Sequence, residues 1–262
     1  MKYNLLPRLV FGVAAVSAFG QTLEQASPNV QAPVTIPKHL EIARELVATV
    51  KPENNKYVIL HHTGVHWKGD LFIRENSVNT MCVGLVTAVL EHANSPTVGK
   101  VKSNTQWKRE LRVNNYHEAI SRELGFNRIF KMSSVLPGDV FAFSCKDKCS
   151  VTDANQHATD NVQGHITFVD DKPTPKNPTP PLIDGTLQWL LPVIDSSPGP
   201  HDLNDTRWRP KDEPRVSGVG RGTLRIYTDL DGVPVGYTSG PNAKKLHTIQ
   251  DRPIVFGRPQ SY

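Results

Sequence analysis

Residues 136–143, LPGDVFAF, divide the chain into two parts with different hydrophobic patterns. Before Pro137-Gly138, apolar residues recur at helical spacing, as they do over 40–50. After it, short runs rich in β-branched and aromatic residues alternate with turn residues. Helices followed by strands predict a single domain of the α+β class.

Working outward from that boundary, helices are expected over residues 40–50, 82–93 and 115–124. The second is apolar over most of its circumference, which predicts a buried, central position. Strands are expected over residues 139–143, 165–169, 187–194, 223–227, 233–237 and 254–256. The prolines crowded between 173 and 181 predict a loop that does not pair with a strand.

Composition excludes several classes of protein. With 262 residues, 38% of them hydrophobic, the chain can bury a substantial core. A charged fraction of 21% and a mean hydropathy of -0.38 argue against both a disordered chain and a multi-spanning membrane protein. The net charge of +5 is not gathered in a Lys/Arg block, so no nucleic-acid partner is expected.

The N-terminus has the pattern of a secretory signal. Lys2 and Arg8 precede the uncharged, apolar run 9–19, and small residues come just before Gln21. That run is too short to span a bilayer, which takes about 20 residues. We therefore expect residues 1–20 to be a signal peptide cut after Gly20, giving a secreted or periplasmic protein without stable membrane insertion.

The rest of the chain is expected to have two parts. Residues 21–38 carry three prolines among polar residues, which is typical of a flexible tail. Residues 39–262 are expected to form one folded domain, and the sequence leaves its oligomeric state open.

Three cysteines are an odd number for an exported protein. Cys145 and Cys149 are close enough in sequence to form a disulfide within a loop, which leaves Cys82 alone. Cys82 opens the apolar helix, where unpaired N–H groups and the helix dipole favour a thiolate. The alternative is a small buried hydrophobe at the start of a core helix.

A thiolate nucleophile needs a base, and the base needs an orienting group. His165 opens one expected strand and Asp195 closes the next. If these strands are antiparallel neighbours, both side chains can lie on one edge of the sheet, and the Cys82 helix packed across it would complete the set. His165 would then take the thiol proton and later protonate the leaving amine, while Asp195 fixes its tautomer.

Several segments surround these residues in a recognisable order. They are Asn79–Val86 (NTMCVGLV), Leu136–Val140 (LPGDV), Gly164–Val169 (GHITFV), Val193–Ser197 (VIDSS), Asp205–Arg207 (DTR), Gly218–Thr223 (GVGRGT) and Pro253–Pro259 (PIVFGRP). Together they resemble the NlpC-type, papain-like cell-wall cysteine peptidases, specifically an exported and poorly characterised branch. The resemblance extends over residues 52–259.

This resemblance implies a papain-like fold over 39–262, with N-terminal helices and the Cys-bearing helix packed on an antiparallel sheet. It implies Cys82 as nucleophile, His165 as base and Asp195 as the third polar residue, without a cofactor. The implied substrates are peptide or isopeptide amides of peptidoglycan stems. Tyr57 could help the Cys82 backbone N–H to stabilise the oxyanion.

The segment around the cysteine departs from the family pattern. The family usually has Asp before the cysteine and Ser after it, whereas Met81 and Val83 stand here. This departure supports an alternative hypothesis, in which the chain is a weakly active or inactive wall-binding domain of the same fold. Acyl transfer through the same thioester is a further alternative.

Two other groups of residues allow alternative readings. Arg207 and Arg221 could hold substrate carboxylates through bidentate contacts, or Arg207 could pair with Asp205 to brace a long loop. The paired His61 and His62 resemble the first ligand segment of zinc N-acetylmuramoyl-alanine amidases, although the later ligands of that family are missing. Gly218, Gly220 and Gly222 alternate, but no helix follows them to make a phosphate site.

Overall fold

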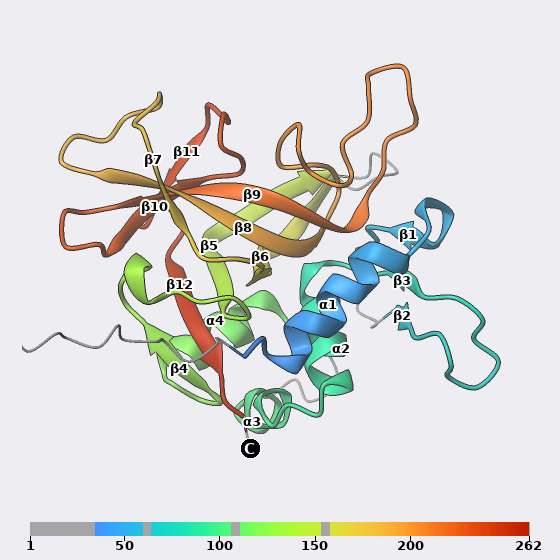
Figure 1. The fold of residues 1–262 in the computed structure, drawn as a ribbon. Coiled ribbons are helices and arrows are strands. Elements are labelled where there is room, and N and C mark those ends of the chain that lie inside the picture. Colours follow the sequence, from blue (N-terminus) through green and yellow to red (C-terminus); the bar gives the residue numbers. More distant parts are fainter. Residues whose placement is uncertain (1–34, 60–63, 106–110, 153–157, 262) are drawn as a thin grey trace, which may run out of the picture. The chain divides into compact units, whose positions relative to one another are not determined.

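The computed structural model describes residues 35–59, 64–105, 111–152 and 158–261, leaving aside the side chains of 146–163. Residues 36–262 form one compact unit (Figure 1). The expected signal peptide, 1–20, and the expected tail up to residue 34 lie outside the described residues. None of the described helices has the length and apolar character needed to cross a membrane.

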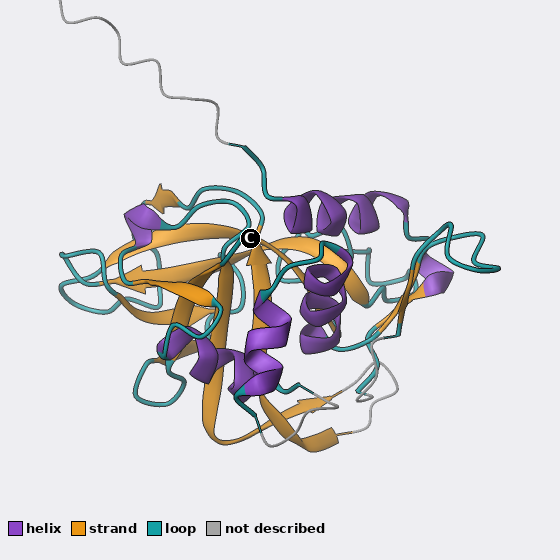
Figure 2. Cartoon of the chain, turned by 90° about the horizontal axis from the view of Figure 1, so that it is seen from below, coloured by secondary structure: helices purple, strands orange, loops and turns teal. Residues whose placement is uncertain are grey.

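More of the described residues lie in strands than in helices (Figure 2). In the described residues a nine-stranded sheet has the order β11-β10-β9-β8-β6-β5-β12-β4, with β7 paired to β8, and its neighbours are antiparallel. Its strands are β4 (Phe126–Ile129), β5 (Val140–Thr152), β6 (Ala158–Val169), β7 (Thr174–Lys176), β8 (Leu187–Ser197), β9 (Gly218–Thr228), β10 (Pro234–Thr238), β11 (Leu246–Thr248) and β12 (Ile254–Pro259).

A smaller sheet leads into the central helix. It contains β1 (Asn55–Lys56), β2 (Val65–His66) and β3 (Ser77–Asn79), in the order β1-β3-β2. The described α-helices are α1 (Lys38–Thr49), α2 (Cys82–His92), α3 (Thr97–Ser103) and α4 (Val113–Ser121), and the short 3-10 turns are η1 (Pro52–Asn54) and η2 (Met132–Ser134).

The expected fold class is wrong. We expected an α+β, papain-like NlpC-type domain, with N-terminal helices and the Cys-bearing helix packed on an antiparallel sheet. The described residues instead form a mostly β structure, with a nine-stranded antiparallel sheet, a three-stranded sheet and four helices of 7 to 12 residues. The reason is that the strands continue well past their apolar centres, to 11 to 13 residues in β5, β6, β8 and β9.

Several individual elements are confirmed. The three expected helices correspond to α1, α2 and α4, and the expected strands lie within or overlap β5, β6, β8, β9, β10 and β12. The proline-rich segment is different from what we expected, because residues 174–176 form β7 and pair with β8. Pro175 is tolerated there because β7 lies at an edge, where a missing N–H breaks no second ladder.

The large sheet contributes to two apolar clusters, and β5, β6, β8, β9 and β12 each have residues in both. Ile166 and Phe168 of β6 pack with the helices, whereas Phe143 of β5 and Val169 belong to the second cluster. His165 of β6 pairs with Phe143 of β5, and their rings are 6.1 Å apart. Helix α2 contacts both β6 and β8.

Candidate functional site

Cys82 lies at the first position of α2, and the start of this helix is fixed by neighbouring strands. The Ser196 hydroxyl of β8 donates a 2.6 Å hydrogen bond to the carbonyl of Thr80, and the Thr80 N–H donates to the Lys56 carbonyl at 3.2 Å. Met81 occupies the N-cap position and makes no side-chain cap. The first N–H groups of α2 are therefore not taken by a capping side chain, unlike those of a helix capped by Asp or Ser.

The thiol of Cys82 is buried and free. Cys145, by contrast, is disulfide-bonded. The expected partner Cys149 has a side chain outside those that the structure describes. Among the described cysteines, Cys82 is thus the one whose sulfur is available for chemistry.

His165 connects this thiol to a buried carboxylate. Its Nε2 lies 2.5 Å from Oδ2 of Asp195, which leaves Nδ1 as the nitrogen able to face Cys82. Burial of the ring lowers the pKa of His165, but the charge of Cys82, followed by hydrogen bonds to Asp195 and Cys82, raises it to about 10 overall. The structure thus pairs His165 with Asp195 and places Cys82 close enough to affect the pKa of His165.

Asp195 is fully buried and in contact with three cationic or protonatable groups. His165 and His201 each place Nε2 against Oδ2, and Nη1 of Arg207 lies 2.9 Å from Oδ1. That contact is an ion pair without hydrogen-bond alignment, so Oδ1 accepts no hydrogen bond from the described residues. Burial raises the pKa of Asp195, but the charges of Arg207 and His201 outweigh it and hold the pKa well below its usual value.

Arg207 is a buried support for Asp195 and has no free face for a substrate. Its side chain is 1% exposed, and two of its nitrogens hydrogen-bond both oxygens of Asp205 at 2.9 and 2.7 Å. It also donates to the carbonyl of Gly218 at 3.0 Å. Of the two readings of this segment, the Arg–Asp pair that braces the loop is the one found.

The alternating glycines of β9 make room for this polar layer. A Cβ on Gly220 would lie 2.5 Å from Nε of Arg207, and a Cβ on Gly222 would overlap the carboxylate of Asp205. Gly218 has a positive φ of 93° and faces the side-chain amide of Asn55, which pairs with the backbone of Val219. These glycines therefore hold buried protein side chains where a phosphate cradle would need open space.

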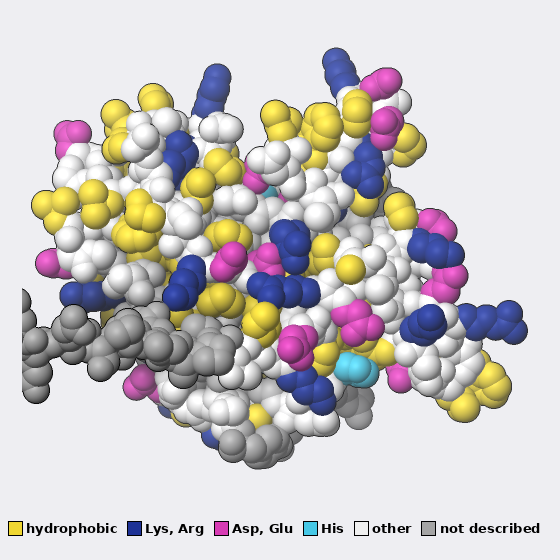
Figure 3. All heavy atoms as spheres, viewed as in Figure 1, with side chains coloured by type: hydrophobic (Ala, Val, Ile, Leu, Met, Phe, Trp, Pro, Cys, Tyr) yellow, Lys and Arg dark blue, Asp and Glu magenta, His cyan; other side chains and the backbone are white. Residues whose placement is uncertain are grey.

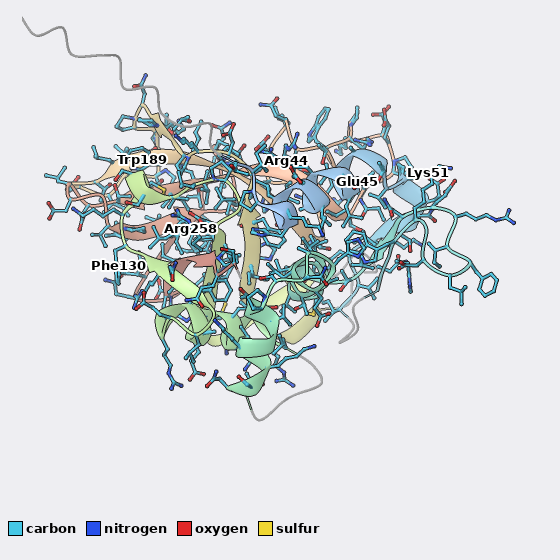
Figure 4. All side chains as sticks on the ribbon, turned by 60° about the horizontal axis from the view of Figure 1, so that its bottom comes forward. Arg44, Glu45, Lys51, Phe130, Trp189 and Arg258 are labelled. Carbon is cyan, nitrogen blue, oxygen red and sulfur yellow. The ribbon has the colours of Figure 1, made fainter. Side chains whose placement is uncertain are left out.

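The remaining predicted residues lie nearby in different settings. Arg221, which is exposed, pairs through Nε with Asp170 at 2.6 Å. Arg44 pairs with the same carboxylate at 2.8 Å, and Figure 4 shows Arg44 on α1. On the face drawn in Figure 3, basic and acidic side chains lie side by side. Tyr57 is buried and follows Lys56, whose carbonyl binds the start of α2, so it lies beside the turn into that helix.

Two residues at the site had no catalytic role predicted from sequence. His201, which binds Asp195, was only one of several histidines available for a zinc site, and Ser196, which binds the Thr80 carbonyl, was only part of the VIDSS segment. His201 lies in the loop after β8, and Ser196 reaches a residue 116 positions away. Only the tertiary structure brings them to the site.

The same group has a composition that could hold a metal ion. One ligand atom from each of His165, Asp195 and His201 lies within 4.8 Å of the others. Both imidazoles already hydrogen-bond the carboxylate, and the charge of Arg207 beside it opposes a second cation. His61 and His62, the expected zinc ligands, lie outside the described residues.

Comparison with known proteins gives little further information. No protein-family model matches the chain, and no solved structure matches it. The chain is similar to an uncharacterized protein of Acanthamoeba polyphaga mimivirus, with 28% identity over 236 residues, which cover 86% of this chain and 98% of the viral protein.

Proposed function

We propose that the chain is a hydrolase of amide bonds that uses Cys82 as nucleophile, His165 as general base and acid, and Asp195 to orient the imidazole. The observation that carries the proposal is the arrangement around His165. Its ring binds a buried carboxylate, and its pKa is raised by a buried, free thiol. A thiol, a base and an orienting group in contact are the elements of nucleophilic catalysis.

The chemistry follows in two steps. The Cys82 thiol gives its proton to His165, and the resulting thiolate attacks the amide carbon. The oxyanion that forms is stabilised by N–H groups at the start of α2. His165 then protonates the departing amine, leaving a thioester on Cys82. Water attacks the thioester and gives a proton to His165, and transfer of this proton to the departing sulfur releases the acid and restores the thiol. If an amine replaces water, the product is a transferred acyl group.

The proposed substrates are peptide or isopeptide amides of peptidoglycan stem peptides. Support for this substrate class comes from the sequence segments 79–86, 164–169 and 193–197, and the fold does not add to it. The mechanism needs no metal or organic cofactor. Peptidoglycan fragments are accordingly the first compounds to screen.

Alkylation of Cys82 tests the proposal without requiring the natural substrate. We expect rapid iodoacetamide labelling of wild type below neutral pH, read by peptide mass spectrometry, and slower labelling of His165→Ala. His66→Ala is the matched control, because His66 is an exposed histidine of β2. Slow labelling with the profile of an ordinary thiol, whose pKa is about 8.5, unchanged in His165→Ala, would contradict the proposal.

Substrate assays then separate hydrolysis from binding. Hydrolysis of muropeptides should disappear in Cys82→Ala, whereas binding by a wall-binding domain would survive it. Activity that a chelator abolishes and zinc restores, while Cys82→Ala remains active, would contradict the thiol mechanism.

A further inference from the structure

The ring of His201 has an acceptor at each nitrogen. Its Nε2 lies 2.8 Å from Oδ2 of Asp195, and its Nδ1 lies 2.8 Å from the carbonyl oxygen of Ser239. A backbone carbonyl only accepts hydrogen bonds, and so does an ionised carboxylate. A neutral imidazole has one N–H and can satisfy only one of the two oxygens. Both contacts are hydrogen bonds only if both nitrogens are protonated.

We propose that His201 is held as an imidazolium and is a positioning residue for the His165–Asp195 pair. The inference rests on the proposed function and deepens it, because it assigns the group that holds the orienting carboxylate. Oδ2 of Asp195 accepts from both rings, whose centroids are 6.3 Å apart. By binding the oxygen that His165 uses, His201 fixes the direction from which that oxygen meets the catalytic ring.

The surrounding structure fixes His201 from several directions. Its backbone N–H donates to Oδ2 of Asp205 at 3.0 Å. A Cβ on Gly222 would lie 2.9 Å from the Cδ2 atom of the ring, so the absence of a side chain there makes room for it. The His201 side chain is 10% exposed and has contacts at both ring nitrogens and along one edge. It therefore has little freedom to turn away from Asp195.

The charge of His201 has a second consequence. The ionisable groups around it come from β8, β6 and its own loop, and they are Asp195, His165, Asp202, Asp205 and Arg207. Among these, His165 is the one that must gain and lose a proton during the reaction. A like charge at 6.3 Å opposes protonation of His165 by roughly 1–2 pH units at an effective dielectric of about 20.

Nuclear magnetic resonance of histidine-labelled protein tests the charge directly. In wild type at neutral pH, both ring nitrogens of His201 should have the shifts of protonated nitrogens. The second readout is the titration of His165 in a Cys82→Ser background, where loss of the thiolate brings its midpoint into an accessible range. There His201→Gln, which retains an N–H donor without a charge, should raise the midpoint of His165 by roughly 1–2 pH units.

The direction of the shift separates the proposal from a merely structural role. If His201 only supported the fold, its loss would let the Asp195 carboxylate turn away from His165, and the midpoint of His165 would fall. A lowered or unchanged midpoint, or a wild-type His201 with one unprotonated nitrogen, would overturn the inference. His247→Gln is the matched control, because the His247 ring stacks on Tyr237 and makes no ion pair with Asp195. If Cys82→Ser leaves the midpoint of His165 unchanged, the proposed function fails instead.

Discussion

Gly220→Ala should destabilise the protein by forcing a methyl group against a buried arginine. An added Cβ would lie 2.5, 2.7 and 2.8 Å from Nε, Cδ and Cγ of Arg207. Favourable contacts between heavy atoms occur at about 3.5–4.0 Å, so the arginine would have to move by about 1 Å. These atoms belong to the middle of a side chain whose end is anchored to Asp205 and Asp195.

The size of the effect follows from what Arg207 holds. It is buried between two carboxylates, and moving it weakens its contacts with at least one of them. Overpacking a core costs about 1–3 kcal/mol, and breaking a buried ion pair costs about 3–5 kcal/mol. We expect a loss of about 3 kcal/mol, which for a folded unit of this size lowers the melting temperature by about 6–12 °C.

Urea unfolding followed by tryptophan fluorescence measures this loss, provided that the m-value is unchanged. The matched control is Gly199→Ala, in the loop between β8 and β9, because a Cβ there would meet nothing within 4 Å. The control should stay within about 0.5 kcal/mol of wild type. If Gly220→Ala unfolds at the same urea concentration as Gly199→Ala, the assignment of Gly220 as space for Arg207 is refuted.

Three further predictions address other parts of the structure. Ser196→Ala removes the hydroxyl that binds the Thr80 carbonyl, and it should lower the free energy of unfolding in urea by about 1–2 kcal/mol and slow the alkylation of Cys82. Unchanged stability and labelling would contradict a role of Ser196 in fixing the start of α2. Arg258→Gln leaves the buried Asp139 without its guanidinium partner and should lower the free energy of unfolding by about 1–2 kcal/mol. Arg122→Gln breaks an exposed ion pair with Glu118 and should lower it by less than about 0.5 kcal/mol. Equal losses in the two variants would contradict this difference. Because the folded pKa of His165 is raised from 6.5 to about 10, its stabilisation is complete below pH 6.5 and lost as the pH rises through 10. Melting temperatures should therefore fall more steeply over this range in wild type than in His165→Gln, and parallel curves would argue against the coupling.

The strong hydrophobic periodicity of the sequence predicted most helices and strands, but it did not predict where the strands end. The helical stripe of 40–50 and the apolar run of 82–93 both form helices close to those bounds. The strand expected over 223–227 in fact begins at Gly218. This start was not predicted, because residues 218–222 include three glycines and carry little hydrophobic signal. Such extensions add ladder pairs that no local pattern shows, and they are what makes the fold mostly β.

The candidate site was predictable only where a residue carried its own local signal. Cys82 is a lone cysteine at a helix start, and His165 and Asp195 stand near the ends of apolar strand runs. The roles of His201 and Ser196 were not predictable, because they depend on the contacts of His201 with Asp195 and Ser239 and of Ser196 with Thr80, which only the fold creates. The sequence predicted that Asp205 and Arg207 could pair. It did not predict their burial, because that depends on β9, which follows them in the chain.

The glycines of β9 explain why that burial is affordable in free energy. Glycine in a strand costs about 0.5–1 kcal/mol relative to alanine, since it loses more conformational freedom on folding. At Gly220 and Gly222 a side chain would occupy the volume of Arg207, Asp205 and His201. Without that volume Asp195 would remain buried without its cations, at a cost of about 3–5 kcal/mol. The larger penalty decides the matter, so an alternation of glycines around Arg221 indicates a layer of buried charges behind the strand.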